Sequence, residues 1–342
     1  MTGSPPMDFA VAYKGRRVYV TGADGFIGSH LVERLVEYGA NVTALVQYNA
    51  FDRLGWLDDV PDDIRKCCRP VVGDIRDAAF MTGSLKGHDI VFHLAALIGI
   101  PFSYVAPASY VETNLLGTLN VLEAARANGA QRVVHTSTSE VYGTAVSVPI
   151  QESHPLQGQS PYAASKIAAD MMAEAYHRSF GLSVVILRPF NTYGPRQSER
   201  AVIPTIITQL LSGSTSLRLG RVTPRRDLNY VSDTVNAFLA IGQAEGDIVG
   251  QVFNAGSGCD VSISDVAALL QRIMGTQVPA VVEPARVRPE ASEVMRLQAD
   301  ATRLAKVTGW SPSVRLEDGL RLTVEWWSRR LGSRKPDGSY KV

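Results

Sequence analysis

The chain reads Val18-Tyr19-Val20-Thr21-Gly22-Ala23-Asp24-Gly25-Phe26-Ile27-Gly28 near its amino terminus, where a β-branched run passes directly into a loop with three glycines. Residues 29–37 then follow the pattern of an amphipathic helix. Glycine permits a tight turn and a close approach of the backbone to a pyrophosphate, and the start of the helix supplies N–H donors and a positive dipole. In this strand–loop–helix context we predict a dinucleotide site formed by Gly22, Gly25, Phe26, Ile27 and Gly28.

Strands and helices continue to alternate over the first 190 residues. The predicted strands lie at 18–21, 42–46, 69–72, 89–93, 132–137 and 182–188, with helices at 110–128 and 163–179. Such alternation is typical of a parallel sheet with helices on both faces, and the handedness of the crossovers restricts the topology to a doubly wound sheet. The predicted fold class is α/β, a Rossmann-like doubly wound parallel sheet with a smaller substrate-binding α/β lobe.

This alternation breaks after Phe190, where Gly, Pro, Thr and Arg become frequent. Residues 231–241 and 251–254 again resemble a helix and a strand of the large sheet. The polar, basic end of the chain is expected to be disordered. The expected division is 14–190 with 226–257 for the dinucleotide-binding domain, 191–225 with 258–332 for the smaller lobe, and 333–342 for the disordered tail.

The composition argues against several classes of protein. Of 342 residues, 45% are apolar and 20% are charged, and the net charge of +1 shows no excess of basic residues for nucleic acid. The longest apolar stretch, 90–101, is too short to span a bilayer, and residues 1–17 lack the pattern of a secretory signal. Cys67 and Cys68 are adjacent and Cys259 stands alone, which predicts neither a disulfide framework nor a metal site. We expect a soluble cytoplasmic protein.

A phenol and an ammonium group lie four residues apart in Tyr162-Ala163-Ala164-Ser165-Lys166, and therefore on one face of a helix. An adjacent ammonium favours the phenolate and lowers the pKa of the tyrosine toward a range useful for a base. The upstream sequence Thr136-Ser137-Thr138-Ser139-Glu140-Val141-Tyr142-Gly143 follows a predicted strand, at the carboxyl edge where α/β sheets bind ligands. The candidate catalytic residues are Thr138, Ser139, Glu140, Tyr162 and Lys166.

Together with the glycine loop, these segments resemble the extended short-chain dehydrogenase/reductase family, which contains NAD-dependent sugar epimerases, 4,6-dehydratases and decarboxylases. The resemblance covers 15–327 and extends to Arg188-Pro189-Phe190-Asn191-Thr192-Tyr193-Gly194-Pro195-Arg196 and Arg226-Asp227-Leu228-Asn229-Tyr230-Val231. It implies an enzyme that acts on a nucleotide-diphosphate sugar. It also implies a homodimer in which helices 110–128 and 163–179 of two copies form a four-helix bundle.

The resemblance implies the rest of the cofactor site as well. The family places an Asp against the adenine after the third strand, and small residues after the fourth strand let the cofactor lie close. In NAD enzymes an acid about twenty residues past the glycines binds the ribose 2′-hydroxyl, but here no carboxylate follows the second strand before Asp52. NAD is the expected cofactor, and NADP stays open. The further expected contacts are Asp74, Ile75, Leu94, Ala95 and Ala96, together with Tyr162 and Lys166.

The triplet Thr138-Ser139-Glu140 discriminates among members of this family. Epimerases need only oxidation at C4 and rotation of the sugar, and usually have small or hydroxyl residues at the last two places. A carboxylate at Glu140 implies a base for the C5 proton, which is the extra requirement of dehydration. UDP-glucuronate decarboxylases share the triplet, so a decarboxylase stays open, as do a 4-epimerase and a non-catalytic NAD(P)-sensing protein.

The resemblance therefore implies a 4,6-dehydratase that makes a 4-keto-6-deoxy sugar. Thr138 and Tyr162 hold O4, Tyr162 takes its proton, Glu140 takes the proton from C5, and water leaves from C6. Some dehydratases have Asp at the position of Ser139, so the acid for water expulsion stays open. Stretches such as 135–145 and 48–58 are similar to GDP-N-acetylglucosamine 4,6-dehydratases of legionaminic acid biosynthesis, which favours GDP-GlcNAc as the substrate.

Four residues are candidates for binding the nucleotide diphosphate. Guanidinium groups match phosphate oxygens, which makes Arg218, Arg226 and Arg288 candidates, although each could equally be an ordinary surface residue. Asn191 follows the sheet in the family's diphosphate-binding segment. His93 is expected to be a structural residue beside the cofactor.

Overall fold

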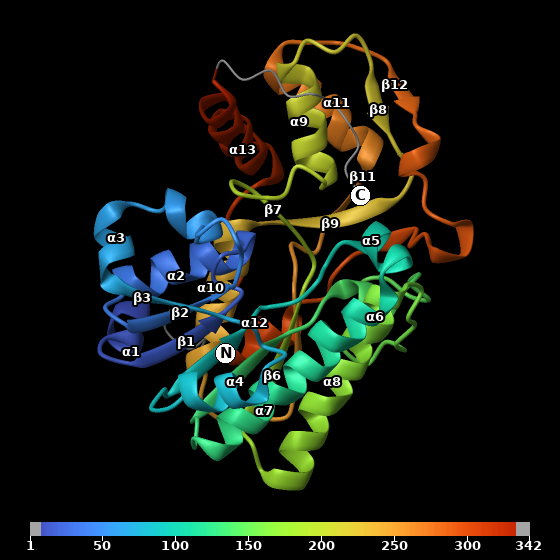
Figure 1. The fold of residues 1–342 in the computed structure, drawn as a ribbon. Helices are drawn as coiled ribbons and strands as arrows, with labels where there is room; N and C mark the ends of the chain where they lie inside the picture. Colours follow the sequence, from blue (N-terminus) through green and yellow to red (C-terminus); the bar gives the residue numbers. More distant parts are fainter. Residues whose placement is uncertain (1–7, 333–342) are drawn as a thin grey trace.

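The structure, a computed structural model, describes residues 8–332. The expected tail, 333–342, lies outside the described residues. A parallel sheet of seven strands forms the centre of the larger part, in the order β10-β6-β5-β4-β1-β2-β3 (Figure 1). The strands are β1 Arg17–Thr21, β2 Asn41–Gln47, β3 Cys68–Gly73, β4 Ile90–His93, β5 Arg132–Thr136, β6 Val184–Pro189 and β10 Val252–Ala255.

The predicted fold class is confirmed by this sheet. Each predicted strand overlaps an observed one, and the order of the strands reverses direction between β1 and β4. In open α/β sheets ligands bind outside the carboxyl ends of the strands at such a switch point. A ligand is therefore expected to bind at the loops that follow β1, β4 and β5.

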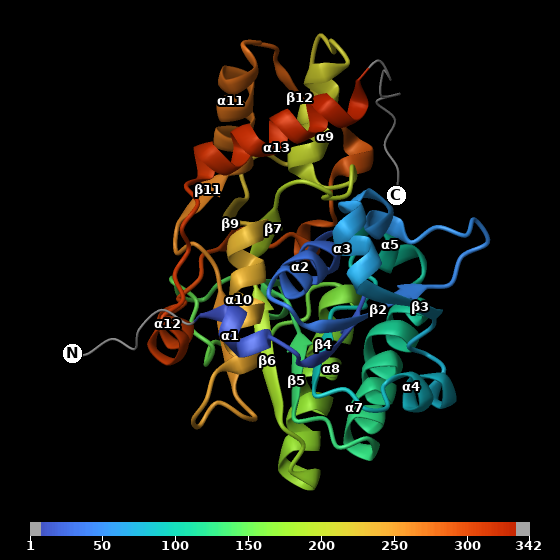
Figure 2. The same ribbon diagram turned by 90° about the vertical axis from the view of Figure 1, so that its left-hand side faces the viewer.

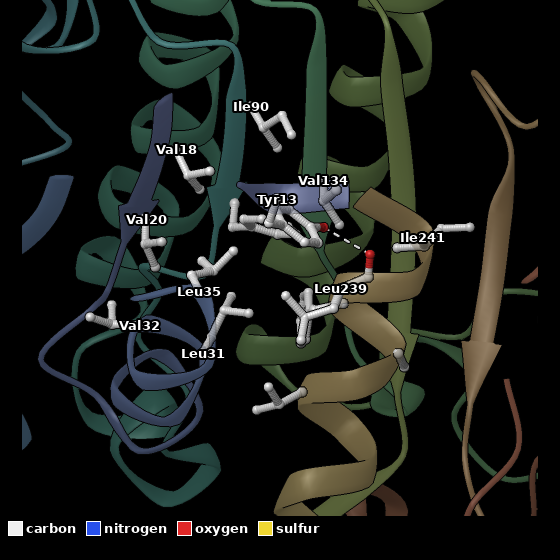
Figure 3. Close-up of a cluster of buried hydrophobic side chains, with 14 of the residues drawn as sticks. Tyr13, Val18, Val20, Leu31, Val32, Leu35, Ile90, Val134, Leu239 and Ile241 are labelled. Atoms are coloured by element: carbon white, nitrogen blue, oxygen red, sulfur yellow. Dashed lines mark hydrogen bonds between the residues drawn. The ribbon is translucent and has the colours of Figure 1, made fainter. Parts of the chain in front are cut away.

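Helices cover both faces of the sheet (Figure 2). The side chains of a strand alternate between the faces, so Val18 and Val20 of β1 enter one core cluster and Tyr19 enters the other. Figure 3 shows the first cluster, in which the buried Tyr13 hydroxyl donates a 2.8 Å hydrogen bond to the carbonyl oxygen of Leu239. The first face carries α1 Phe9–Tyr13, α2 Phe26–Glu37, α3 Asp62–Cys67, α10 Val231–Gln243 and α12 Thr302–Thr308, and the second carries α4 Ala78–Ser84, α7 Gly117–Ala127 and α8 Pro161–Phe180.

The long helix α8 has clear start and stop signals in the sequence. Ser160 precedes it, and its side chain accepts a 3.1 Å hydrogen bond from the Ala163 amide. Pro161 occupies the first position, where its missing N–H costs nothing. Gly181 ends the helix in the left-handed conformation at φ 67°. These signals place the predicted Tyr–Lys pair in the first two turns of the helix.

The smaller lobe lies above the large sheet in Figure 1 and has its own core. Its four-stranded sheet joins β7 Asn191–Tyr193, β9 Arg225–Tyr230, β11 Asp260–Ser262 and β13 Arg296–Leu297, and a two-stranded sheet joins β8 Leu217–Leu219 to β12 Ala280–Val282. Its helices are α9 Val202–Leu211, α11 Ile263–Met274 and α13 Leu316–Leu331. Between β4 and α7, the chain forms two short helices, α5 Ile100–Val105 and α6 Pro107–Tyr110, and the π-helix Val111–Leu116.

The bounds predicted for the two domains stay a prediction. Leu304 and Trp310 fall in the segment 258–332, expected for the lobe, yet their side chains pack in the core of the large sheet. The segment 191–225 holds β7, α9 and β8 of the lobe. Within residues 8–332, no helix is long and apolar enough to cross a membrane.

An aromatic contact joins the two parts near the glycine loop. The rings of Trp56, in the 3-10 helix Gly55–Asp59, and Trp326, in α13, have centroids 5.6 Å apart. Arg330 lies over both rings, and its guanidinium contacts the Asp59 carboxylate at 3.0 Å. The Trp56 amide also donates a 3.0 Å hydrogen bond to the carbonyl oxygen of Asp24. The loop that follows β1 is therefore held against the smaller lobe.

Candidate active site

The loop after β1 approaches its neighbours too closely for any side chain. Gly22 has a φ of 67°, and a Cβ there would lie 2.7 Å from the Ala95 nitrogen. A Cβ at Gly28 would lie 2.0 Å from the Gly22 carbonyl oxygen. Gly25 stands at the N-cap of α2 without a side chain to cap the helix, so the first N–H groups of α2 are left for another acceptor. This cradle fits the pyrophosphate of a dinucleotide, and Phe26 and Ile27 form the first turn of α2 beside it.

The loop after β4 closes the other side of this cradle. The Thr21 hydroxyl oxygen accepts hydrogen bonds from the Leu94 and Ala95 amides, both at 3.0 Å. The same hydroxyl lies 2.8 Å from Nδ1 of His93, whose Nε2 lies 2.9 Å from the Thr118 hydroxyl. Burial holds the pKa of His93 well below its usual value, so the ring is a neutral structural link. Ala96 directly follows the two bonded amides.

The loops after β2 and β3 line the far end of the cradle. Asp74 forms an ion pair with Arg76 at 2.6 Å, which lowers the pKa of the carboxyl group. Ile75 packs against Gly117, where a Cβ would lie 2.5 Å from the isoleucine Cδ1. At the end of β2 the Gln47 amide donates to the Asp24 carboxylate at 3.3 Å. The glycine loop thus places the carboxylate of Asp24 at the end of β2.

Three candidate catalytic residues meet at the carboxyl end of β5. Thr138 follows the strand and caps the 3-10 helix Ser139–Tyr142, accepting a 3.2 Å hydrogen bond from the Glu140 amide. A side-chain hydrogen bond joins Thr138 to Tyr162, and the Glu140 carboxylate lies close enough to act electrostatically on the same phenol. Tyr162, Glu140 and Ser139 are all buried. A phenol, a hydroxyl and a carboxylate in one buried group can hold a substrate oxygen and move protons.

The electrostatics of Tyr162 differ from the expectation. Burial, helped by the negative charges of Glu140 and Asp170 and by Tyr110, raises the pKa of Tyr162 above its usual value of 10, and only the bond from Thr138 lowers it. Lys166 was expected to favour the phenolate, but its ammonium donates a 2.6 Å hydrogen bond to the Thr136 carbonyl oxygen. Desolvation therefore outweighs the helix spacing in setting this pKa.

Burial also acts on Lys166 itself. Desolvation lowers the pKa of its ammonium group to about 8, although the negative charge of Asp170 opposes this shift. Lys166 therefore loses its charge close to physiological pH, while exposed lysines stay charged until far higher pH.

Asn114, which belongs to a segment similar to the family but is not among the predicted site residues, supports the start of α8. The predicted helix 110–128 is interrupted by the π-helix Val111–Leu116, which turns Asn114 inward. The Asn114 amide nitrogen donates to the Ser165 hydroxyl oxygen and to the Leu97 carbonyl oxygen, both at 2.9 Å. Ser165 in turn donates to the Tyr162 carbonyl oxygen at 2.7 Å. A π-helix is a frequent mark of a functional site, but apolar periodicity does not reveal one in a sequence.

The four candidate substrate residues do not all meet. Asn191 begins β7, and its buried side-chain oxygen has no hydrogen-bond partner among the described residues, which suits a ligand. Arg226 and Arg288 converge on Glu293, with nitrogen–oxygen distances of 3.3 and 3.6 Å. Arg218 lies apart, on β8 in the two-stranded sheet.

Known proteins share this combination of sequence and structure. A family model described as GDP-mannose 4,6 dehydratase matches residues 19–323. A dTDP-glucose 4,6-dehydratase from Actinoplanes sp. is 34% identical, covering 91% of this chain and 97% of the relative. The chain belongs to the extended short-chain dehydrogenase/reductase family of nucleotide-sugar epimerases and dehydratases.

Relatives in this family differ in the reaction that their names give. A UDP-glucose 4-epimerase from Mycolicibacterium smegmatis is 35% identical, covering 92% of this chain and 99% of the relative. Among solved structures, DesIV, a dTDP-glucose 4,6-dehydratase from Streptomyces venezuelae with NAD and TYD bound, has a TM-score of 0.83 at 34% identity, covering 92% of this chain and 98% of that one. Membership of the short-chain dehydrogenase/reductase family therefore leaves the reaction to be argued from the site.

We predict that Lys166 titrates separately from the other lysines of this family member. The sequence has seven lysines, so their 13Cε resonances can be resolved by NMR. The wild-type resonance that disappears in the Lys166→Arg variant belongs to Lys166. In the wild type this resonance should titrate with a midpoint near pH 8, because burial stabilises the charged ammonium group less than water does. A midpoint above pH 10, as for an exposed lysine, would show that Lys166 is hydrated rather than desolvated.

Proposed function

We propose that this protein is a nucleotide-sugar 4,6-dehydratase, converting an NDP-hexose or NDP-N-acetylhexosamine to its 4-keto-6-deoxy form. The observation that carries the proposal is the buried carboxylate of Glu140 beside Tyr162 and Thr138. Epimerisation at C4 needs no base for C5, whereas dehydration across C5 and C6 does. A carboxylate in this place therefore favours elimination of water.

NAD is the proposed cofactor, with NADP as the alternative. Solved relatives hold NAD, among them DesIV and MoeE5. In this chain Gly22, Gly25 and Gly28 would hold the pyrophosphate, and the loops at Asp74 and Ala95 would flank it. When bound, NAD supplies the acceptor for the hydride of C4 and its donor to C6.

The residues of the chain perform the proton transfers. Thr138 and Tyr162 hold O4, and Tyr162 takes the O4 proton in its phenolate form, which the hydrogen bond from Thr138 favours against the effect of burial. Glu140 then takes the C5 proton, which the new ketone has made acidic. Once protonated, Glu140 can give this proton to the departing C6 hydroxyl, which leaves as water, with Ser139 next to it in the buried segment. C5 then takes up a proton from solvent as C6 is reduced, which is why solvent deuterium is expected at C5. Lys166 would bind the ribose of the cofactor.

The substrate side of the proposal rests on Asn191, Arg226 and Arg288. Asn191 presents a buried oxygen without a partner among the described residues, and Arg226 and Arg288 bring two guanidinium groups to one place, as a diphosphate requires. Arg218 lies on a different sheet, apart from the other three candidate residues. The similarity of residues 135–145 and 48–58 to GDP-N-acetylglucosamine 4,6-dehydratases favours GDP-GlcNAc as the substrate.

We expect Glu140→Gln to abolish dehydration, because glutamine keeps the shape of the side chain but has no basicity. Formation of the 4-keto-6-deoxy sugar from a panel of nucleotide sugars, including GDP-GlcNAc, should fall roughly hundredfold to ten-thousandfold. Mass spectrometry detects the loss of water, and solvent deuterium should no longer enter C5. The matched control is Glu290→Gln, an exposed carboxylate of the smaller lobe.

The same assay separates the rival reactions. Loss of carbon dioxide from a wild-type incubation would indicate a decarboxylase, and an unchanged mass with an altered C4 would indicate an epimerase. A wild-type protein that binds NAD and converts none of the sugars would be a sensor. A Glu140→Gln variant that dehydrates at the wild-type rate would remove the main support for the proposal.

The glycine cradle predicts the effect of a single methyl group on cofactor binding. In Gly28→Ala the new Cβ would lie 2.0 Å from the Gly22 carbonyl oxygen, so the loop must open. The affinity for NAD, measured by calorimetry beside NADP, should fall at least about tenfold. Gly83→Ala is the matched control, because the Cβ there meets no described atom within 4 Å. Equal NAD affinity in both variants would contradict the cradle.

The homodimer is also proposed, built on α7 and α8. Apolar side chains stay exposed along these helices and the π-helix before them, at Val111, Leu116, Met171 and Phe180. A second copy would bury them, as the family resemblance implies. Light scattering should give a dimer for the wild type and a lower mass for Met171→Glu, but not for Leu322→Glu, an exposed leucine on α13. A wild-type monomer at micromolar concentration would refute the dimer.

A further inference from the structure

A buried ion pair lies directly behind the catalytic pocket and takes no part in the proposed reaction. Asp170 stands one turn after Lys166 on α8 and is fully buried. One oxygen of its carboxylate accepts hydrogen bonds from Nε and a terminal nitrogen of Arg188, at 3.1 and 2.9 Å. Arg188 lies in β6 and is 2% exposed. Two buried charges of this kind are costly to desolvate and give little net stability, so the pair calls for another explanation.

The hydrogen bonds of the pair lead to both ends of the segment that carries Glu140. At one end, the Ser137 hydroxyl donates to the Asp170 carboxylate at 2.7 Å. At the other end, Arg188 donates to the Tyr142 hydroxyl oxygen at 3.0 Å, and its guanidinium lies 5.0 Å from the centre of the Tyr142 ring. Ser137 immediately precedes Thr138, and Tyr142 ends the 3-10 helix that contains Glu140.

The Tyr142 end of the segment is fixed by a further bond. The Tyr142 hydroxyl donates to the side-chain oxygen of Asn254 at 2.7 Å, and the Asn254 side-chain nitrogen donates to the Ile150 carbonyl oxygen at 3.0 Å. Asn254 lies in β10 beside Arg188 in the sheet. The segment 137–142 is thus joined at both ends to a frame that also contains the helix of Tyr162 and Lys166.

Other charged groups face the same carboxylate. Lys166 acts on Asp170 electrostatically, and His135 Nε2 lies 3.3 Å from its second oxygen. Burial and the neighbouring Lys166 lower the pKa of His135, so the ring is neutral and Arg188 is the partner that matches the charge of Asp170.

We propose that Asp170 and Arg188 are positioning residues that set the place of Glu140 relative to Tyr162. The inference rests on the proposed dehydratase reaction, in which the two residues act in succession on neighbouring carbons of one sugar. Two side chains on different segments can do so only if those segments keep a constant separation. A shift of about 1 Å in such a constellation can cost about a hundredfold in rate.

Removal of the Tyr142 hydroxyl tests the inference without breaking the ion pair. Tyr142→Phe should leave KM and oxidation at C4 close to wild type, because Tyr162 is unchanged and the Thr138 end of the segment is still held by the bond from Ser137 to Asp170. Entry of solvent deuterium at C5 and release of product should slow roughly tenfold to hundredfold. Oxidation at C4 is followed by the nicotinamide absorbance after rapid mixing. Ser137→Ala, which frees the other end of the segment, should act in the same direction.

The matched control is Tyr13→Phe. Tyr13 is also fully buried and donates one hydrogen bond, but it lies in the first core cluster (Figure 3), separate from the cluster that contains Tyr142. The inference is overturned if Tyr142→Phe and Ser137→Ala slow oxidation at C4 as much as they slow deuterium entry at C5. It is also overturned if neither variant slows deuterium entry at C5. If Tyr142→Phe does not fold, Ser137→Ala decides by the same comparison. Failure of the wild type to form any 4-keto-6-deoxy sugar would instead refute the proposed function, so the two failures are distinguishable.

Discussion

The close contact between the loops after β1 and β4 is the constraint on which the rest of the site depends. These loops meet at the switch point of the sheet, where the order of the strands reverses between the paired strands β1 and β4. The Thr21 hydroxyl ties the two loops together through the Leu94 and Ala95 amides. Backbone approaches this near exclude every side chain at Gly22 and Gly28. The glycines are therefore demanded by packing as much as by the ligand that the loop is proposed to hold.

Burial is the second determinant of the chemistry. The side chains at the end of β5 are buried, and desolvation is the largest influence on the pKa values of Tyr162 and Lys166. Tyr162 is held in its neutral form and Lys166 is made easier to deprotonate, and both shifts have burial as their largest cause. In such a site a hydrogen bond or an ion pair has more effect than it has in water. The Asp170–Arg188 pair and the Thr138 hydroxyl owe their influence to this environment.

The residues proposed to bind the substrate lie on the smaller lobe, next to the chain's exit from the large sheet. Asn191 leaves the large sheet at the end of β6 and enters the small one, and Arg226 lies on β9 of that small sheet. Glu293, from a later loop, brings Arg226 and Arg288 together. The contact of Trp56 with Trp326 and Arg330 then links the lobe to the glycine loop. The proposed cofactor and substrate residues are thus connected through contacts between the two parts of the molecule.

The sequence alone determined the α/β class, the parallel strands, the glycine loop and the Tyr162–Lys166 helix, because each depends on residues close together in the chain. Hydrophobic periodicity, helix-capping residues and the spacing of glycines are local properties of the sequence. The position of Asn114 was not determined in this way, since the sequence predicts one continuous helix over 110–128, whereas residues 111–116 form a π-helix that buries Asn114.

Only the tertiary structure decided which distant groups share a site. It brought Asp24 to the end of β2, joined Asp170 to Arg188, and placed Glu293 between two arginines while leaving Arg218 on another sheet. It also reversed the expected direction of the pKa shift of Tyr162. The physical reason is the same in each case: desolvation and charge pairing depend on distance in space. The four-residue spacing of Tyr162 and Lys166 fixes their common helix face, but it does not determine which other parts of the chain surround them.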